Sequence, residues 1–370
     1  MTLRILRKLH RWIGLLLLLP LLIEGLTGTI LTLEPLWARD SIQPSAVTAP
    51  IEANAVLQLA RTLAPAGMRV TRFNPPPSAG APATVYLGEA GSPRAAAVLR
   101  IDSAGLRQVG EIESATGPIG VVHGLHASLL IPGLGGRSIL GWPGIGLALL
   151  ILSGIPLWWP ATGQVRAAFT VPSGARGLRL HRRLHGALGI WLLPLLLLSG
   201  VTGTVLGFPQ TSRQWLGLPA GGPQRAPNVS TNQAPVEIPD IDRAIALART
   251  AVPGTTPRMI ILPAAREPIR LFMAAPGASG AVANSVVQVS GARIISVQAA
   301  ADASGADLAL RWMRDLHSGD GIGLAGRLLV ALAGLALPVF GVTGAAMWWL
   351  KRAKRQRLQA DRAATFQPAE

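Results

Sequence analysis

Four long apolar runs divide the chain into alternating hydrophobic and polar segments. They cover residues 12–33, 139–159, 186–207 and 327–350. Each run has about the 20 residues that a helix needs to cross the hydrocarbon core of a bilayer. Prolines and glycines inside such helices are tolerated, because neighbouring groups satisfy the freed backbone. The pattern therefore predicts four transmembrane helices.

The first run follows a basic start, as the core of a signal peptide does. It spans residues 12–33, contains Glu24 and lacks an Ala-x-Ala cleavage signature. A signal peptide has a shorter core and a small-residue cleavage site. We interpret the first run as an uncleaved helix.

The two long polar segments, 34–138 and 208–326, have the pattern of small α+β domains. Each begins with an amphipathic helix, predicted over 52–63 and 240–252, with Asp240 as the cap of the second. Short β-type runs follow, separated by turn residues such as those at 102–105. The predicted strands are 69–73, 84–87, 96–101 and 106–112 in the first segment, and 258–262, 269–273, 285–289 and 293–297 in the second.

Composition supports a membrane protein and excludes several kinds of site. Hydrophobic residues make up 49% of the chain and charged residues only 14%, whereas a soluble domain carries about 25% charged residues. The chain has no cysteine. This excludes disulfides, thiolate metal sites, iron–sulfur clusters and covalently attached c-type haem.

The net charge of +16 is concentrated at one side of the predicted membrane. Residues 1–11, 160–185 and 351–370 together hold 15 basic side chains and only two acids, Asp361 and Glu370. The positive-inside rule places these three segments in the cytoplasm and both long segments outside. The charge therefore reflects topology and does not predict a nucleic-acid partner. The basic tail 351–357 is expected to bind anionic membrane lipid.

The chain contains an internal duplication. His10 and Gly14 recur as His185 and Gly189, and the Gly-x-Thr-Gly-Thr segment at 25–29 recurs at 200–204, both 175 residues later. Leu125-His126 recurs as Leu316-His317, and Trp158-Trp159 as Trp348-Trp349, after 191 and 190 residues. Each half crosses the membrane twice, so the halves are parallel repeats. We predict an all-α transmembrane bundle of four helices from two repeats, each with an outer α+β domain.

All six histidines lie near the ends of the apolar runs. The repeat pairs His10 with His185 and His126 with His317. A two-fold axis would bring each pair face to face between helices. Zinc prefers about four ligands, and no further ligand types recur with the histidines, whereas two imidazoles suit the axial positions of a six-coordinate haem iron. Without cysteine, such a haem is b-type, and two are expected per chain. The alternative is that each histidine is an ordinary interfacial side chain.

Further residues are secondary candidates. Arg137 and Arg327 occupy equivalent positions and could pair with haem propionates or with lipid head groups. His123 and His181 have no histidine counterpart and are possible outer-shell groups or alternative ligands. Glu24 is the only acid within an apolar run, so it is a candidate for a proton or hydrogen-bond role or for a structural group.

The sequence resembles the PepSY-associated transmembrane proteins. The resemblance rests on His10-Arg-Trp-Ile-Gly14, the two Gly-x-Thr-Gly-Thr segments and the Trp-Trp that ends the fourth run. It implies an iron-regulated protein of the bacterial inner membrane with two periplasmic PepSY-like domains. Members include ferric-siderophore reductases with two b-type haems, so it also implies His10, His185, His126 and His317 as haem ligands. No flavin-binding extension or dinucleotide fingerprint is present, so the electron donor would be another molecule.

Three functions remain in competition at this point. The first is a di-haem oxidoreductase that passes electrons from a cytoplasmic donor to a periplasmic ferric siderophore. The second is a non-enzymatic, membrane-anchored binding or regulatory module of PepSY type, which leaves the paired histidines unexplained. The third is a transporter, against which stand the small number of helices and the lack of predicted broken half-helices.

Overall fold

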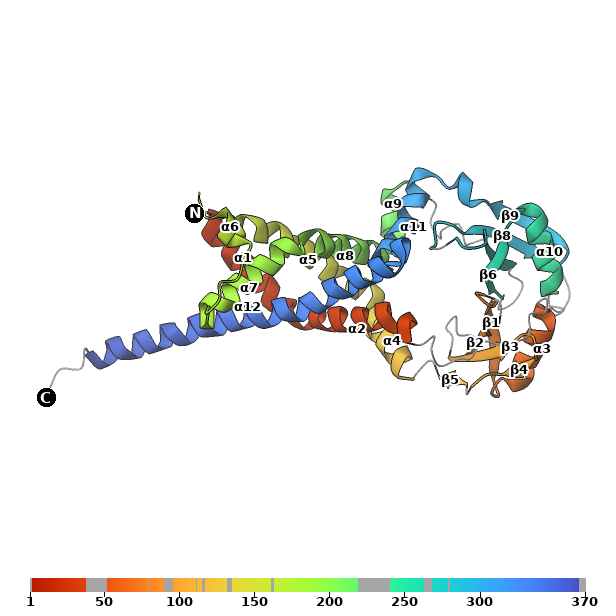
Figure 1. Cartoon of the computed structure of the whole chain (residues 1–370), viewed down its shortest axis with the longest axis horizontal. Helices are drawn as coiled ribbons and strands as arrows, with labels where there is room; N and C mark the ends of the chain where they lie inside the picture. The colour runs from red at the N-terminus through yellow and green to blue at the C-terminus, as the bar shows by residue number, and fades with distance from the viewer. Residues whose placement is uncertain are drawn as a thin grey trace. The chain divides into compact units, whose positions relative to one another are not determined.

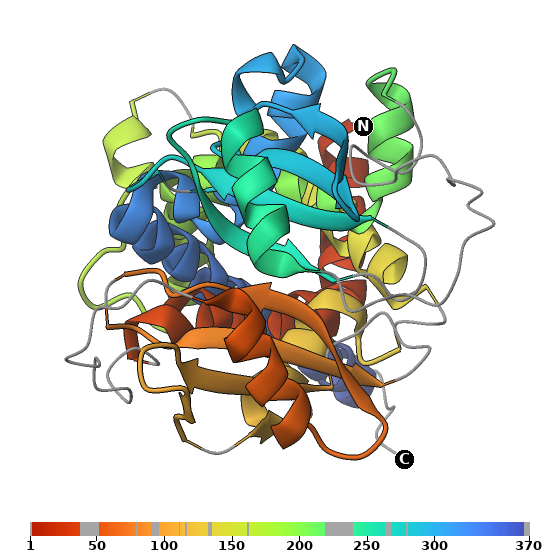
Figure 2. The same cartoon turned by 90° about the vertical axis from the view of Figure 1, so that its right-hand side faces the viewer.

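The computed structural model describes residues 2–37, 52–78, 80–89, 96–110, 112–114, 117–131, 135–160, 163–218, 240–262, 268–278 and 280–365. The chain forms two compact units. A helical unit contains residues 1–33, 124–208 and 316–370, and a sheet unit contains residues 34–123 and 209–315. Figures 1 and 2 show the helices and the sheet in two views.

The helical unit is built from the apolar runs. Its long helices are α1 (Thr2–Leu16), α2 (Leu18–Trp37), α5 (Gly136–Trp158), α7 (Gly177–Trp191), α8 (Leu193–Gly207) and α12 (Gly323–Thr365). Shorter helices are α6 (Val165–Ala168) and the 3-10 turn η3 (Asp320–Ile322). The last residues of α4 (Pro118–Ser128) and of α11 (Gly305–Ser318) also belong to this unit. Helix α5 packs on α1 and α8, and α12 packs on α1, α7 and α8 (Figure 1).

Glycines let the helices of this unit approach closely. A Cβ atom added to Gly25 of α2 would lie 2.5 Å from the carbonyl oxygen of Gly334 in α12. At the equivalent crossing, a Cβ atom on Gly144 of α5 would lie 2.8 Å from the carbonyl oxygen of Gly200 in α8. Small residues at helix crossings are typical of membrane proteins, where close packing replaces the hydrophobic effect.

The predicted spans differ from the observed helices at two breaks. In the described residues, three helices are long and apolar enough to cross a membrane, and the pair α7 and α8 makes a fourth if counted as one span. That pair is bent by 70°, so the expectation of no broken half-helix was wrong. Pro194 explains the bend, because it has no N–H for the carbonyl of Ile190. Pro20 likewise follows the break between α1 and α2 at Leu17.

The fourth predicted helix is longer than expected. Helix α12 continues from the apolar run through the basic segment to Thr365. Residues 351–364 are rich in Lys, Arg, Gln, Leu and Ala. These are strong helix formers, so the helix does not end where hydrophobicity ends.

The sheet unit contains one antiparallel sheet, whose strands come from both polar segments. The strands of the first segment are β1 (Met68–Asn74), β2 (Ala83–Glu89), β3 (Ala97–Asp102), β4 (Arg107–Gln108) and β5 (Glu113–Ser114). Those of the second are β6 (Thr256–Ile261), β7 (Ile269–Ala274), β8 (Ser285–Ser290) and β9 (Arg293–Gln298). The order is β4-β3-β2-β1-β6-β7-β8-β9, with β5 pairing with β3. The two segments expected as separate domains are therefore joined.

The joining contact is the pair β1 and β6. Arg72 lies opposite Ile261 and Phe73 opposite Ile260, and the N–H of Leu262 donates to the carbonyl of Thr71 at 2.9 Å. Phe73 and Ile260 are fully buried. One hydrophobic core therefore runs through both halves of the sheet unit.

Two helices cover one face of this sheet, α3 (Ala53–Leu63) and α10 (Ile241–Ala251) (Figure 2). Their N-termini cap each other. Asp242 accepts hydrogen bonds from the N–H groups of Ala53 and Asn54 at 2.8 and 3.0 Å, and the Asn54 side chain accepts one from Ile241 at 2.9 Å. Asp240 caps α10 as predicted, because its side chain accepts a hydrogen bond from the backbone N–H of Arg243. This hydrogen bond lowers the pKa of the Asp240 carboxyl below its ordinary value.

The predicted strands are present, except that 106–112 is reduced to β4. Leu106 has a φ of 44° and Gly110 a φ of 73°, so the backbone leaves the extended region on both sides of Arg107–Gln108. The sheet unit also contains α9 (Pro209–Trp215), the 3-10 turn η2 (Ala300–Asp302), residues 118–123 of α4 and most of α11.

Candidate functional site

The first candidate site is a pair of histidines from α1 and α7. The ring centroids of His10 and His185 are 6.3 Å apart, with an angle of 76° between the ring planes. Both side chains are partly buried between helices. The two residues are 175 positions apart in the chain, and the repeat predicted that they face each other.

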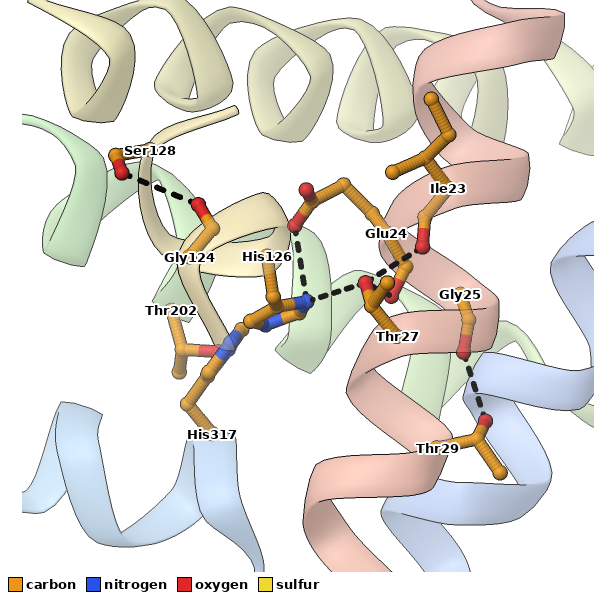
Figure 3. A network of polar contacts seen from close by, with 10 residues as sticks. All are labelled: Ile23, Glu24, Gly25, Thr27, Thr29, Gly124, His126, Ser128, Thr202 and His317. Carbon is orange, nitrogen blue, oxygen red and sulfur yellow. Dashed lines mark hydrogen bonds and ion pairs between the residues drawn. The ribbon is translucent and has the colours of Figure 1, made fainter. Parts of the chain in front are cut away.

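The second candidate site is the other predicted pair, from α4 and α11. The ring centroids of His126 and His317 are 6.1 Å apart, with an interplanar angle of 36°. Figure 3 shows the two rings pointing toward each other. The structure therefore brings together both pairs that the duplication matched.

Each of the four rings is held by a hydroxyl group on a neighbouring helix. The Nδ1 atom of His10 lies 2.9 Å from Ser153 Oγ, and that of His185 lies 2.8 Å from Thr343 Oγ1. At the second pair, Nδ1 of His126 lies 3.1 Å from Thr27 Oγ1 (Figure 3). The corresponding distance from His317 to Thr202 Oγ1 is 3.0 Å.

These hydroxyl groups determine which ring nitrogen carries the proton. Each hydroxyl donates its only hydrogen to a backbone carbonyl one turn earlier, at distances of 2.6 to 2.7 Å. The hydroxyl oxygen then has only lone pairs to offer, so Nδ1 must be the donor. In the neutral imidazole this leaves the lone pair on Nε2. If these histidines bind a metal, the same contact would orient all four rings with Nε2 as the ligand atom.

A glycine follows each of these hydroxyl residues and lies against the same ring. A Cβ atom added to Gly28 would lie 3.0 Å from Cε1 of His126, and one added to Gly203 would lie 3.4 Å from Cε1 of His317. For the first pair, the corresponding distances are 3.5 Å from Gly154 to His10 and 3.8 Å from Gly344 to His185. A hydroxyl residue followed by a glycine therefore contacts a histidine ring at four places.

The spacing of the rings fits a metal ion with two opposed imidazole ligands. Two metal–nitrogen bonds of about 2 Å in line place the ring centres roughly 6 Å apart, close to the 6.3 and 6.1 Å observed. Within the described part of the chain, no group of three or more His, Asp or Glu side chains could hold a metal ion. A ring spacing of about 6 Å is the one that two imidazole ligands on opposite sides of a haem iron would need.

Glu24 lies beside the second histidine pair, and the other half of the chain has no carboxyl group at the equivalent position. Its Oε2 lies 3.4 Å from Nδ1 of His126 (Figure 3), and its Oε1 is buried without a hydrogen bond among the described residues. The repeat offset of 175 places Ser199 at the equivalent position. The carboxyl group therefore distinguishes the surroundings of His126 from those of His317.

The two arginine candidates are engaged by protein groups. Arg137 donates from Nε to the carbonyl of Leu206 at 2.8 Å. Arg327 forms an ion pair with Asp320, with Nη2 and Oδ1 2.7 Å apart. Both contacts lie near helix ends, where they fix the start of α5 and of α12.

The two unpaired histidine candidates lie outside the pairs. His123 of α4 is exposed and belongs to the sheet unit, although it precedes His126 by only three residues. His181 lies one turn before His185 on α7, and its Nδ1 is buried without a hydrogen bond among the described residues. The structure brings neither of them into a ring contact with a paired histidine.

Sequence reasoning missed the four hydroxyl residues as partners of the histidines. Thr27 and Thr202 lie inside the Gly-x-Thr-Gly-Thr segments, which indicate the duplication and the family resemblance but not the contact with histidine. Ser153-Gly154 and Thr343-Gly344 are 190 residues apart, the same offset as the Trp-Trp pairs. A search for Ser/Thr-Gly dipeptides conserved between the two halves would have found all four.

Comparison with known proteins places the chain in a family. A model of the PepSY-associated TM region matches residues 7–351. No curated protein matches the chain. The match covers all four paired histidines and their four hydroxyl partners. The chain is therefore a membrane protein that belongs to the PepSY-associated TM family.

Proposed function

We propose that this protein is a transmembrane di-haem b oxidoreductase that carries electrons from a donor on the cytoplasmic side to a ferric siderophore in the periplasm. The observation that supports it most is the geometry of the two histidine pairs. Each pair presents two imidazoles about 6 Å apart with Nδ1 held by a hydroxyl group. An arrangement that occurs twice, at equivalent positions of two halves, argues against the interfacial interpretation of these histidines.

His10 and His185 would hold one haem, and His126 and His317 the other. A b-type haem held by these imidazoles would supply one-electron transfer. The protein's own groups provide the rest. The four hydroxyl groups fix the ring tautomers, and the adjacent glycines give the rings room.

The four-helix bundle of two parallel repeats is part of this proposal. Its support is the set of equivalent contacts in the two halves. The crossing of Gly25 with Gly334 corresponds to that of Gly144 with Gly200, and the contact of Thr27 with His126 corresponds to that of Thr202 with His317. Because one chain supplies both members of each pair, a single copy suffices for two haems.

The distribution of basic residues supports the proposed direction of electron transfer, because it indicates which histidine pair is on the cytoplasmic side. The first pair lies on helices that begin in basic segments, and the second pair adjoins the long polar segments along the chain. An electron that crosses the full potential from a negative interior gains about 2.3 kcal/mol per 100 mV. Ferric siderophore suits as acceptor, because reduction of the iron weakens its bonds to hard oxygen ligands.

The test is a proteoliposome that encloses a reductant and has a ferric chelate outside. The wild-type protein should reduce the external chelate. His126→Ala and His10→Ala should each abolish transfer, because each removes one member of a pair. His123→Ala is the matched control, since His123 lies on the same helix as His126 but is exposed and unpaired. It should retain the wild-type rate.

A different result would favour the regulatory module. If wild-type protein from haem-replete cells is colourless and no variant affects chelate reduction, the paired histidines have no redox role. The chain would then be a membrane-anchored binding protein whose sheet unit recognises a protein partner.

A further inference from the structure

A cluster of cations at one end of the helical unit surrounds a hollow lined partly by leucines. The hollow has a volume of about 420 Å³ and is lined by Leu178 of α7 together with Leu350, Lys351, Lys354, Arg355 and Leu358 of α12. We call this set of six residues the basic hollow. It contains none of the paired histidines, so it belongs to neither candidate haem site.

The positive charge here comes from three helices that are far apart in the sequence. Lys351 interacts electrostatically with Arg7 and Arg11 of α1, Arg182 of α7 and Arg355 of its own helix. Helix α12 packs on both α1 and α7. The acids of the ion pairs seen between described residues are Asp102, Glu24, Asp307 and Asp320, and none of these lies on α1, α7 or the basic part of α12. The like charges in such a cluster repel one another, and a bound anion reduces this repulsion.

The arrangement on α12 is amphipathic in a way that suits a lipid. Leu350, Lys354 and Leu358 are four residues apart and follow one face of the helix, with Lys351 and Arg355 beside them. Leu350 is the last residue of the apolar run and Lys351 the first of the basic tail, so the hollow includes the boundary between apolar and basic surface. Leu358 is 51% exposed despite its place among the cations.

We propose that the basic hollow is a binding site for an anionic phospholipid, whose phosphate lies against the cations and whose acyl chain lies against Leu178 and Leu350. The combination of leucines with clustered cations distinguishes it from a site for a soluble anion, which makes no contact that requires leucines. Lipid binding of this kind ties α1, α7 and α12 together at the end of the unit where their charges would otherwise push them apart.

Two changes to the hollow test this proposal. Lys351→Gln/Lys354→Gln/Arg355→Gln removes three charges from it, and Leu178→Trp fills it without changing the charge. The matched control is Arg352→Gln/Arg357→Gln/Arg362→Gln, which removes three charges from the same helix outside the hollow. The purified full-length chain is equilibrated with phosphatidylglycerol or phosphatidylcholine of the same acyl chains, and bound lipid is counted by native mass spectrometry.

The proposal predicts at least a tenfold preference of the wild-type protein for phosphatidylglycerol. The triple hollow variant and Leu178→Trp should each lose most of it, while the control triple variant keeps it. Equal losses in both triple variants would show diffuse attraction to charge and would overturn the proposal. So would unchanged binding in Leu178→Trp, or displacement of the lipid by excess glycerol phosphate. Tryptophan fluorescence on heating verifies that each variant is folded.

Discussion

Single hydroxyl groups control how the candidate ligands are presented. Thr27 and Thr202 each accept a hydrogen bond from an imidazole while donating to their own helix. A side chain that is rigid at χ1 and bonded at both ends holds its partner at a fixed angle. The histidines are therefore oriented by neighbouring helices, and not by their own helix alone.

Replacing Thr202 by valine removes the hydroxyl and keeps the shape. The Nδ1–H of His317 then loses the hydroxyl oxygen that accepts its hydrogen bond, and loss of such a partner of a metal-binding histidine typically weakens metal affinity 10- to 100-fold. We expect faster loss of one of two haems from Thr202→Val in a competition assay with apomyoglobin. Thr204→Val is the control, because Thr204 donates to Gly200 in the same way but holds no imidazole. Equal haem loss in both variants would contradict the proposed role.

Glu24 should make the two haem sites inequivalent. Its carboxyl group lies beside Nδ1 of His126, and in its ionised form it would favour the more positive state of a bound iron. Glu24→Gln keeps the size of the side chain, so at alkaline pH, where the carboxyl group of the wild type is ionised, we expect the reduction potential of one haem to rise while the other is unchanged. A spectroelectrochemical titration resolves the two components. If the component that shifts is the one lost in His10→Ala, Glu24 acts on the wrong site.

The paired histidines could be predicted from the sequence, but their partners could not. The duplication brought His10 to His185 and His126 to His317 because equivalent positions of two halves face each other across an axis. No such rule connects Ser153 to His10, since that contact depends on the rotation of α5 relative to α1. The arginines show the same limit, because the ion pair of Arg327 with Asp320 depends on the 3-10 turn η3.

At the scale of elements, two contacts join the two polar segments in the sheet unit. One is the pairing of β1 with β6, and another is the reciprocal capping of α3 and α10. Asp242 satisfies two N–H groups at the start of α3, although it lies in α10. A helix N-terminus leaves such groups without partners inside its own helix. The cap therefore links helices from the first and second polar segments.

Asp242→Ala should destabilise the sheet unit by about 1–2 kcal/mol, the usual cost of losing an N-cap. We expect a lower denaturant midpoint for the loss of sheet signal in circular dichroism. Asp302→Ala, in the short turn η2, is the control and should have little effect. A midpoint equal to that of the wild type would show that Asp242 is not an effective cap.

Element positions followed well from hydrophobic periodicity, whereas breaks and junctions did not. The helices at 52–63 and 240–252 and most strands were found within a few residues. The 70° bend between α7 and α8 was missed because prolines inside apolar runs were treated as tolerated. The pairing of β1 with β6 was missed because about half of the chain lies between the two strands.

At the scale of the whole molecule, the distribution of charge predicts one orientation. Reporter fusions after residues 115 and 300 should be active as periplasmic reporters, and fusions after residues 170 and 365 as cytoplasmic ones. The reason is the concentration of basic residues in the segments 1–11, 160–185 and 351–370. A cytoplasmic result at residue 115 would invert the proposed direction of electron transfer.

The most direct test of the account is the haem content of the purified chain. The pyridine haemochrome assay should give two b-type haems per wild-type chain, with an absorption spectrum of low-spin iron that shifts on reduction. His10→Ala and His126→Ala should each contain one haem, and the double variant none, because each histidine belongs to a different pair. A wild-type protein without haem from haem-replete cells, or single variants that perturb the same spectral component, would contradict the account.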